Sequence, residues 1–140
     1  MESFWHIASG TMVTLSEQQF VDCETTSYGC NGGWMNPVFT YAASHGLATG
    51  ADYPYTGRDG VCYDDTITPI AGLSTNGYVN VSRYNPLALQ TAIRNEGPVT
   101  IAVMAGNQAF MYYSSGVISS GCGTSIDHAI LAVGYGNDGA

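Results

Sequence analysis

The sequence predicts an α+β protein in which helices come first and strands follow. Capped helical patterns occupy the first half of the 140-residue chain, before residue 50. Strand-like apolar runs, "PVTIAVMA", "GVIS" and "HAILAVGYG", fill its last third. The chain has no internal repeat and no low-complexity tract. This order of elements favours two segregated lobes, one helical and one β-rich.

The first predicted helices lie before residue 25. Residues 4–7 look like the tail of an apolar helix that ends at Gly10. The segment "TLSEQQFVDC" predicts a second helix, with Ser16 as its cap and Leu15 as a hydrophobic staple. Gln19 lies three residues after Ser16, which makes it the expected capping-box partner.

A glycine-rich loop, "SYGCNGG", separates these helices from a third, "WMNPVFTYAASHG". In that segment we expect Asn36 to be the cap, Pro37 the first helical residue and Gly46 the stop. Residues 48–75 are loop-like, because the stretch "DYPYTGRDG" is rich in turn residues.

The second half begins with "GYVNV", which alternates as a short strand does. "PLALQTAIRNEG" predicts a helix that Pro86 opens and Gly97 closes. The three strand-like runs follow it. We therefore expect a helical lobe over residues 1–80 and a β-rich lobe over residues 81–140.

Charge and hydropathy exclude two classes of partner. The net charge is −8 and the strong bases are three arginines, so the surface repels phosphate backbones and we expect no nucleic acid. No apolar stretch approaches about 18–20 residues, so no membrane span is expected. The acidity fits simple solubility or adaptation to an acidic compartment. The start of the chain lacks the basic region of a signal peptide, and Met1 is expected to be internal to a longer protein.

The metal-binding and modification patterns are weak. The four cysteines form no pair of Cys-x-x-Cys motifs and the three histidines share no ligand spacing, so no metal site is expected. Spacing alone leaves three disulfide pairings open. Asn80-Val81-Ser82 is a glycosylation acceptor, relevant if the protein enters the secretory pathway. For His6 and His45 a solvated or capping role is expected.

Five segments in order resemble the papain-like cysteine peptidases: "LSEQQFVDC", "SYGCNGGWM", "DYPYTG", "GPVTIAV" and "DHAILAVGYG". Each alone occurs by chance, but together they cover the chain essentially from end to end. The resemblance implies a two-lobe papain-like fold, a helical lobe plus a β-barrel-like lobe. It also implies that both lobes are incomplete within these 140 residues.

The resemblance makes His128 the general base and the partner of a thiolate. In that family the histidine follows the nucleophilic cysteine by about 130–150 residues, which places the nucleophile and the oxyanion-hole glutamine ahead of Met1. The orienting asparagine would follow Ala140, and Asn137 is expected to be a turn residue. The alternative for His128 is a half-buried histidine at a strand end.

The resemblance also pairs Cys23 with Cys62. It leaves Cys30 and Cys122 as positions whose disulfide partners lie outside the chain. Cys30 precedes the helix near Asn36, so a nucleophilic role for Cys30 is the alternative.

By the same resemblance, Gly32 and Gly33 let a peptide lie against the chain as an added strand. Glycines that serve only the turn are the alternative. The substrate-contacting set is completed by Trp34, Met35, Ala102, Ile126, Asp127 and Ala129. Its uncharged pocket walls predict a preference for Leu, Val, Phe or Met two residues before the cut, although each wall residue alone could be plain core.

The implied function is that of a cysteine endopeptidase acting on peptides or proteins, with no cofactor, in a lysosome, a vacuole or outside the cell. A propeptide and protein inhibitors are the further expected partners. A non-catalytic peptide-binding or regulatory homologue and a broken gene product are the alternatives. The 140-residue chain itself is expected to be inactive.

Overall fold

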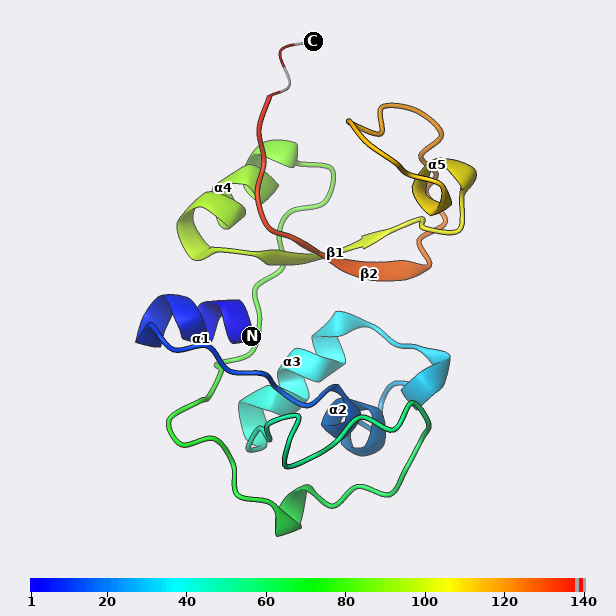
Figure 1. Ribbon diagram of the computed structural model, residues 1–140. Coiled ribbons are helices and arrows are strands. Elements are labelled where there is room, and N and C mark those ends of the chain that lie inside the picture. The colour runs from blue at the N-terminus through cyan, green and yellow to red at the C-terminus, as the bar shows by residue number, and fades with distance from the viewer. Residues whose placement is uncertain (138, 140) are drawn as a thin grey trace. The chain divides into compact units, whose positions relative to one another are not determined.

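The computed structural model describes residues 1–137 and 139. The chain divides into two compact units, Met1–Val81 and Ser82–Ala140 (Figure 1). The first unit contains α1 (Glu2–Ser9), α2 (Glu17–Cys23), η1 (Gly29–Asn31), α3 (Met35–Ser44) and η2 (Asp64–Thr66). The second contains α4 (Pro86–Glu96), β1 (Val99–Val103), α5 (Gln108–Met111) and β2 (His128–Ala132). Whether these units correspond to the two expected lobes stays a prediction.

Three predicted helices have the ends that their sequences indicate. Gly10 adopts a left-handed conformation, with φ of 74°, and ends α1. The Ser16 hydroxyl caps α2 by accepting a hydrogen bond from the backbone N–H of Gln19. Pro86 begins α4 and Gly97 follows its last residue. In these helices the sequence signal is local, and the structure confirms it.

The predicted start of α3 is wrong. The helix begins at Met35, with Trp34 as an extended N-cap, so Asn36 lies within the first turn and caps nothing. Pro37 is therefore the third helical residue. The first four N–H groups of a helix have no intrahelical acceptor, so a proline at that place costs no hydrogen bond.

Two predicted strands, "GYVNV" and "GVIS", are irregular in the structure. A strand needs a paired neighbour, and the sheet of the described residues contains β1 and β2. The short helix α5 was not predicted. Its signal is Asn107, whose side chain accepts a hydrogen bond from the N–H of Phe110 at 2.9 Å.

The hydrophobic core of the first unit lies around α2 and α3. Its buried members are Leu15, Cys23, Tyr41, Ala42, Leu47, Ala48 and Tyr53. Four polar residues are buried with them: Ser16, Gln18, Gln19 and Glu24. Among the described residues every buried side-chain nitrogen or oxygen has a hydrogen-bond partner. The buried polar groups therefore help to hold this core together through hydrogen bonds.

Gln19 binds the segment that follows α3. Its side-chain amide donates to the carbonyl of Gly46 at 2.8 Å and accepts from the N–H of Ala48 at 2.8 Å. The N–H of Ser16 donates to the carbonyl of Ala48. The predicted capping box is half correct. The Ser16 hydroxyl accepts from the Gln19 N–H, but the Gln19 side chain binds the segment after α3 and not the Ser16 N–H.

Gln18 does the same for a second segment. Its amide donates to the carbonyl of Arg58 at 2.8 Å and accepts from the N–H of Thr56 at 2.9 Å. Both glutamines have fully buried side chains. Two irregular segments are therefore fixed to one short helix through side-chain amides, which both donate and accept.

The second unit is a two-stranded antiparallel sheet with α4 packed beside β1. The register pairs Val103 with His128 and Ile101 with Ile130. No residue of this unit that the structure describes is fully buried. No helix among the described residues is both long and apolar enough to span a bilayer.

We expect Gln19→Leu to destabilise the first unit by about 2 kcal/mol, because it leaves the N–H of the buried residue Ala48 without an acceptor and removes the donor to the carbonyl of Gly46. Urea unfolding followed by tyrosine and tryptophan fluorescence measures this change. The matched control is Gln90→Leu on the exposed surface of α4, for which little change is expected. Equal midpoints for the two variants would contradict the role given to Gln19.

Candidate active site

His128 lies at the start of β2, where the chain enters the sheet. It is the first residue of the strand, stands opposite Val103, and is exposed. The preceding residue, Asp127, donates its N–H to the carbonyl of Val103 at 3.0 Å. The backbone on both sides of the imidazole is therefore fixed to β1, while the ring is open to solvent.

The carboxylate of Asp127 closes the turn that follows β1. Its two oxygens accept hydrogen bonds from the N–H groups of Ala105, at 2.6 Å, and Gly106, at 3.0 Å. A Cβ at position 106 would lie 2.7 Å from Asp127 Oδ2, so a larger residue there would displace the carboxylate. Both oxygens of Asp127 are engaged within its own unit, which favours a positioning role; a substrate contact stays a prediction.

Sequence patterns do not indicate this role for Asp127. Its two donors lie 22 and 21 residues away along the chain. No local pattern indicates such a pairing, because it arises only when β1 and β2 come into register.

The structure brings two predicted pocket residues together. Ala102 of β1 and Ala129 of β2 are direct partners, so their side chains share one face of the sheet. Ile126 lies two residues before β2 and is 46% exposed. Their role in binding a substrate side chain stays a prediction.

In the glycine-rich loop of the first unit, the local backbone structure explains why glycine is present. Gly32 has φ of 103°, which other residues rarely adopt. A Cβ on Gly33 would lie 2.4 Å from the hydroxyl oxygen of Ser27. Tyr28 donates its N–H to the carbonyl of Gly32 at 2.9 Å and closes the loop. The fold alone thus accounts for both glycines, and peptide binding there stays a prediction.

The two residues after this loop begin α3. Trp34 is the N-cap and is 59% exposed, and Met35 is the first helical residue, half-buried. An exposed indole next to an open glycine backbone is available to a ligand.

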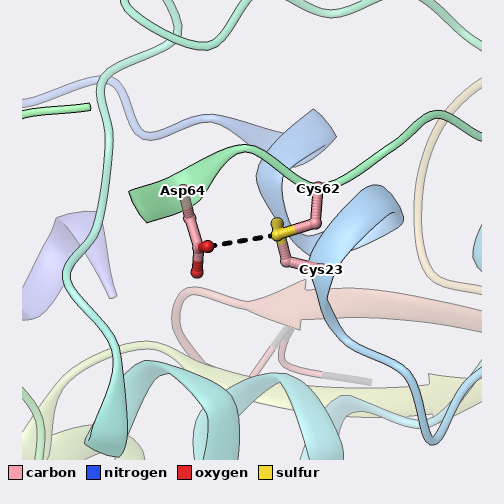
Figure 2. Close-up of side chains that lie close together, drawn as sticks. All are labelled: Cys23, Cys62 and Asp64. Carbon is pink, nitrogen blue, oxygen red and sulfur yellow. Dashed lines mark hydrogen bonds between the residues drawn. A yellow bond between two sulfur atoms is a disulfide. The ribbon is translucent and has the colours of Figure 1, made fainter. Parts of the chain in front are cut away.

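The disulfide between Cys23 and Cys62 is present, as the resemblance implies (Figure 2). It joins residues 39 apart, and closing such a loop contributes about 4 kcal/mol on the chain-entropy account. Asp64 Oδ1 approaches the Cys62 sulfur at 3.2 Å. A disulfide sulfur carries no proton, so this is a sulfur–oxygen contact and not a donated hydrogen bond. It offers no thiolate either, so the cluster of Cys23, Cys62 and Asp64 is unsuited to a metal ion while the bond is intact.

Cys30 and Cys122 are free and exposed in the structure. Desolvation, together with the carboxylates of Asp59 and Asp22, raises the pKa of the Cys30 thiol. A nucleophilic cysteine needs the opposite environment, with nearby positive charge that favours the thiolate. The surroundings of Cys30 therefore argue against the nucleophilic alternative.

Two tyrosines of the first unit act as hydrogen-bond donors to acids. The Tyr53 hydroxyl donates to Asp22 at 2.8 Å and the Tyr41 hydroxyl donates to Asp64 at 2.5 Å. Desolvation, followed by these carboxylate partners, raises the pKa of both phenols. The phenols stay protonated and structural at physiological pH.

The remaining polar candidates have local roles. His45 is the C-cap of α3, and its ring stacks on Tyr41 with centroids 4.1 Å apart. His6 is exposed in the last turn of α1. Asn137 accepts a hydrogen bond from the N–H of Gly139 at 2.9 Å, the pattern of a turn.

Comparison with known proteins identifies the family. The family model described as papain family cysteine protease matches residues 1–140. The chain belongs to the papain family of cysteine proteases. Zingipain-2 of Zingiber officinale is 39% identical over 139 residues, which are 99% of this chain and 62% of that protein. The chain spans between 30% and 63% of the length of curated relatives that it matches.

Solved structures of this family share the fold. The Carica candamarcensis cysteine protease CMS1MS2, in complex with E-64, matches with a TM-score of 0.88 and 42% identity over 95% of this chain and 62% of its own. The proform of the ragweed pollen allergen Amb a 11, a cysteine protease, matches with a TM-score of 0.90 and 37% identity over 99% of this chain and 42% of its own. The expected papain-like α+β class is confirmed.

We expect Asp127→Ala to release the turn after β1. Hydrogen exchange at the amides of Ala105 and Gly106 should rise roughly tenfold, because both lose a charged acceptor. Asp127→Asn retains one acceptor oxygen and should give an intermediate result. Amide exchange measured by NMR checks this, and unchanged exchange in Asp127→Ala would rule out the turn-closing role.

Proposed function

We propose that this chain is part of a cysteine endopeptidase that hydrolyses peptide bonds through a thioester intermediate on its nucleophilic sulfur, with His128 as its general base. The observation that carries the proposal is the family match over residues 1–140, with His128 exposed at the start of β2. An accessible imidazole on a fixed backbone suits proton transfer, because the ring can reach a thiol without losing its orientation.

Three chemical tasks fall to residues of this chain in the proposal. As imidazolium, His128 stabilises the attacking thiolate and then gives its proton to the leaving amine. Gly32 and Gly33 hold the substrate through its main chain. By resemblance, the residues proposed to contact an apolar side chain of the substrate are Trp34, Met35, Ala102, Ile126 and Ala129.

The nucleophile is proposed to lie outside the four cysteines of this chain. Cys23 and Cys62 are consumed in the disulfide. Cys30 lies beside carboxylates that oppose its ionisation. Cys122 and Cys30 are, by resemblance, disulfide positions. The 140-residue chain therefore carries the base without its thiol.

A lysosomal, vacuolar or extracellular location is proposed. The disulfide persists in oxidising compartments and is rare in the cytosol. Asn80 is exposed and lies in an irregular segment, where a glycosylating enzyme can reach it. A propeptide and protein inhibitors are proposed as partners, and the relative Amb a 11 has been solved in its proform.

Two alternative functions can each be tested. A non-catalytic homologue would carry Ser or Gly where the complete gene should encode the nucleophilic cysteine, and would bind peptides without cutting them. A broken gene product would fail to give a cooperative unfolding transition.

The purified 140-residue chain should not cleave fluorogenic peptides. The complete protein should cleave them, and it should be blocked by a thiol-directed inhibitor. In the complete protein His128→Ala should lower kcat/KM by on the order of 10²–10⁴-fold, because the proton acceptor is lost. His6→Ala is the control histidine variant and should leave the rate unchanged. Full activity of His128→Ala would contradict the proposal.

Expression through a eukaryotic secretory pathway should add one N-linked glycan, at Asn80. Treatment with a peptide N-glycosidase should shift the mass of the wild type, and the Asn80→Gln and Ser82→Ala variants should show no such shift. A glycan that persists in Asn80→Gln would show that another position is modified.

A further inference from the structure

Glu24 is a buried carboxylate at the end of α2, and only 7% of its surface is exposed. Its Oε1 accepts hydrogen bonds from the N–H of Thr26 at 2.7 Å and from the hydroxyl of Thr26 at 2.5 Å. Its Oε2 accepts from the N–H of Ser27 at 3.0 Å. All these donors are neutral and lie within three residues, so one side chain folds the segment after α2 into a tight turn.

This turn is joined firmly to the core. The backbone N–H of Glu24 donates to the carbonyl of Phe20 at 3.1 Å, which continues the hydrogen bonding of α2. The preceding residue is Cys23, whose disulfide joins α2 to Cys62. The carboxylate therefore fixes the residues that follow α2 relative to that helix.

The turn ends directly behind the glycine loop. Ser27 lies so close to Gly33 that a Cβ on Gly33 would come within 2.5 Å of the Ser27 Cβ. The next residue, Tyr28, donates its N–H to the carbonyl of Gly32. Ser27 and Gly33 thus leave no room between them for a Cβ, so a displacement of Ser27 toward the loop would push on the backbone of Gly33.

We propose that Glu24 is a positioning residue for peptide binding, holding Ser27 against Gly33 and so fixing the Gly32–Gly33 backbone in the form to which an extended peptide pairs. This rests on the proposed function, in which those glycines bind substrate. A backbone fixed in advance loses less conformational freedom when a peptide adds to it, so affinity rises without any contact between Glu24 and the substrate.

A second carboxylate holds another part of the same loop. Asp59 accepts a hydrogen bond from the N–H of Cys30 at 2.7 Å, and a Cβ on Gly29 would lie 2.0 Å from its oxygen. The loop is therefore held at two points, and Glu24 is the buried member of this pair of carboxylates.

The turn is also suited to acid. Burial by itself would raise the pKa of Glu24, but the hydrogen bonds from Ser27 and Thr26 outweigh it, and the pKa lies below its ordinary value. A carboxyl whose pKa is lowered on folding loses its stabilising effect only as the pH falls through that lowered value. The titratable groups that line the same hollow as Glu24 are Tyr41, His45 and Tyr78.

The test compares Glu24→Gln with two reference variants. Glu24→Gln removes one acceptor oxygen and the negative charge. Glu24→Asp keeps a carboxylate that can accept hydrogen bonds from the same turn. Glu17→Gln makes the same Glu-to-Gln change at an exposed site on α2. In the 140-residue chain, Glu24→Gln should speed amide exchange at Ser27 roughly tenfold and shift the NMR resonances of Gly32 and Gly33. Glu24→Asp and Glu17→Gln should both keep the amide exchange and the resonances of the wild type.

In the complete protein, Glu24→Gln should raise KM for a fluorogenic peptide roughly tenfold with kcat nearly unchanged, since a substrate-binding surface is loosened and the reacting groups are not. Should Glu24→Gln fail to fold, Thr26→Val removes a single donor and should move the same amides in the same direction.

The outcomes separate the two proposals. Unmoved Gly33 resonances, despite fast exchange at Ser27, would overturn the positioning role even in an active protease. An unchanged KM would also overturn it. A wild-type complete protein that neither binds nor cleaves peptides, with the coupling between Glu24 and Gly33 intact, would refute the proposed function and leave no peptide binding to position.

Discussion

The first unit depends on the side-chain amides of two adjacent glutamines. Gln18 and Gln19 are fully buried in a helix of seven residues, too short to be stable alone. Each amide supplies a donor and an acceptor to the backbone of an irregular segment. The helix stabilises the segments and the segments bury the helix, so neither is expected to form without the other.

The features that the sequence predicts well are those whose cause is local. A serine before an acidic turn caps α2, and a proline and a glycine delimit α4. The failures have longer-range causes. "GYVNV" has the composition of a strand, but the structure describes no partner strand for it. α3 begins at Met35, two residues before the predicted start, because an extended Trp34 is sufficient as an N-cap and the first turn tolerates Pro37.

The site shows the same division. Resemblance singled out His128 and the pairing of Cys23 with Cys62, and the disulfide is confirmed. Neither Asp127 as the acceptor for a turn 21 residues away nor the contact between Ser27 and Gly33 could be predicted, because both depend on how the chain returns to itself. The donors around Glu24 are its near neighbours, and an acid followed two and three residues later by Thr and Ser is a pattern that could have indicated the turn.

The bond between Cys23 and Cys62 closes a covalent ring, and that ring encloses Gly32, Gly33, Trp34 and Met35 together with all of α3. A cysteine protease needs its attacking sulfur free, whereas the surface that would hold its substrate is framed here by a sulfur pair that must stay joined. Thiol reductants act on both. Such a protein therefore needs surroundings that are reducing enough to keep the attacking sulfur free and oxidising enough to keep the disulfide intact. The reductant in an assay buffer then affects the structure as well as the activity.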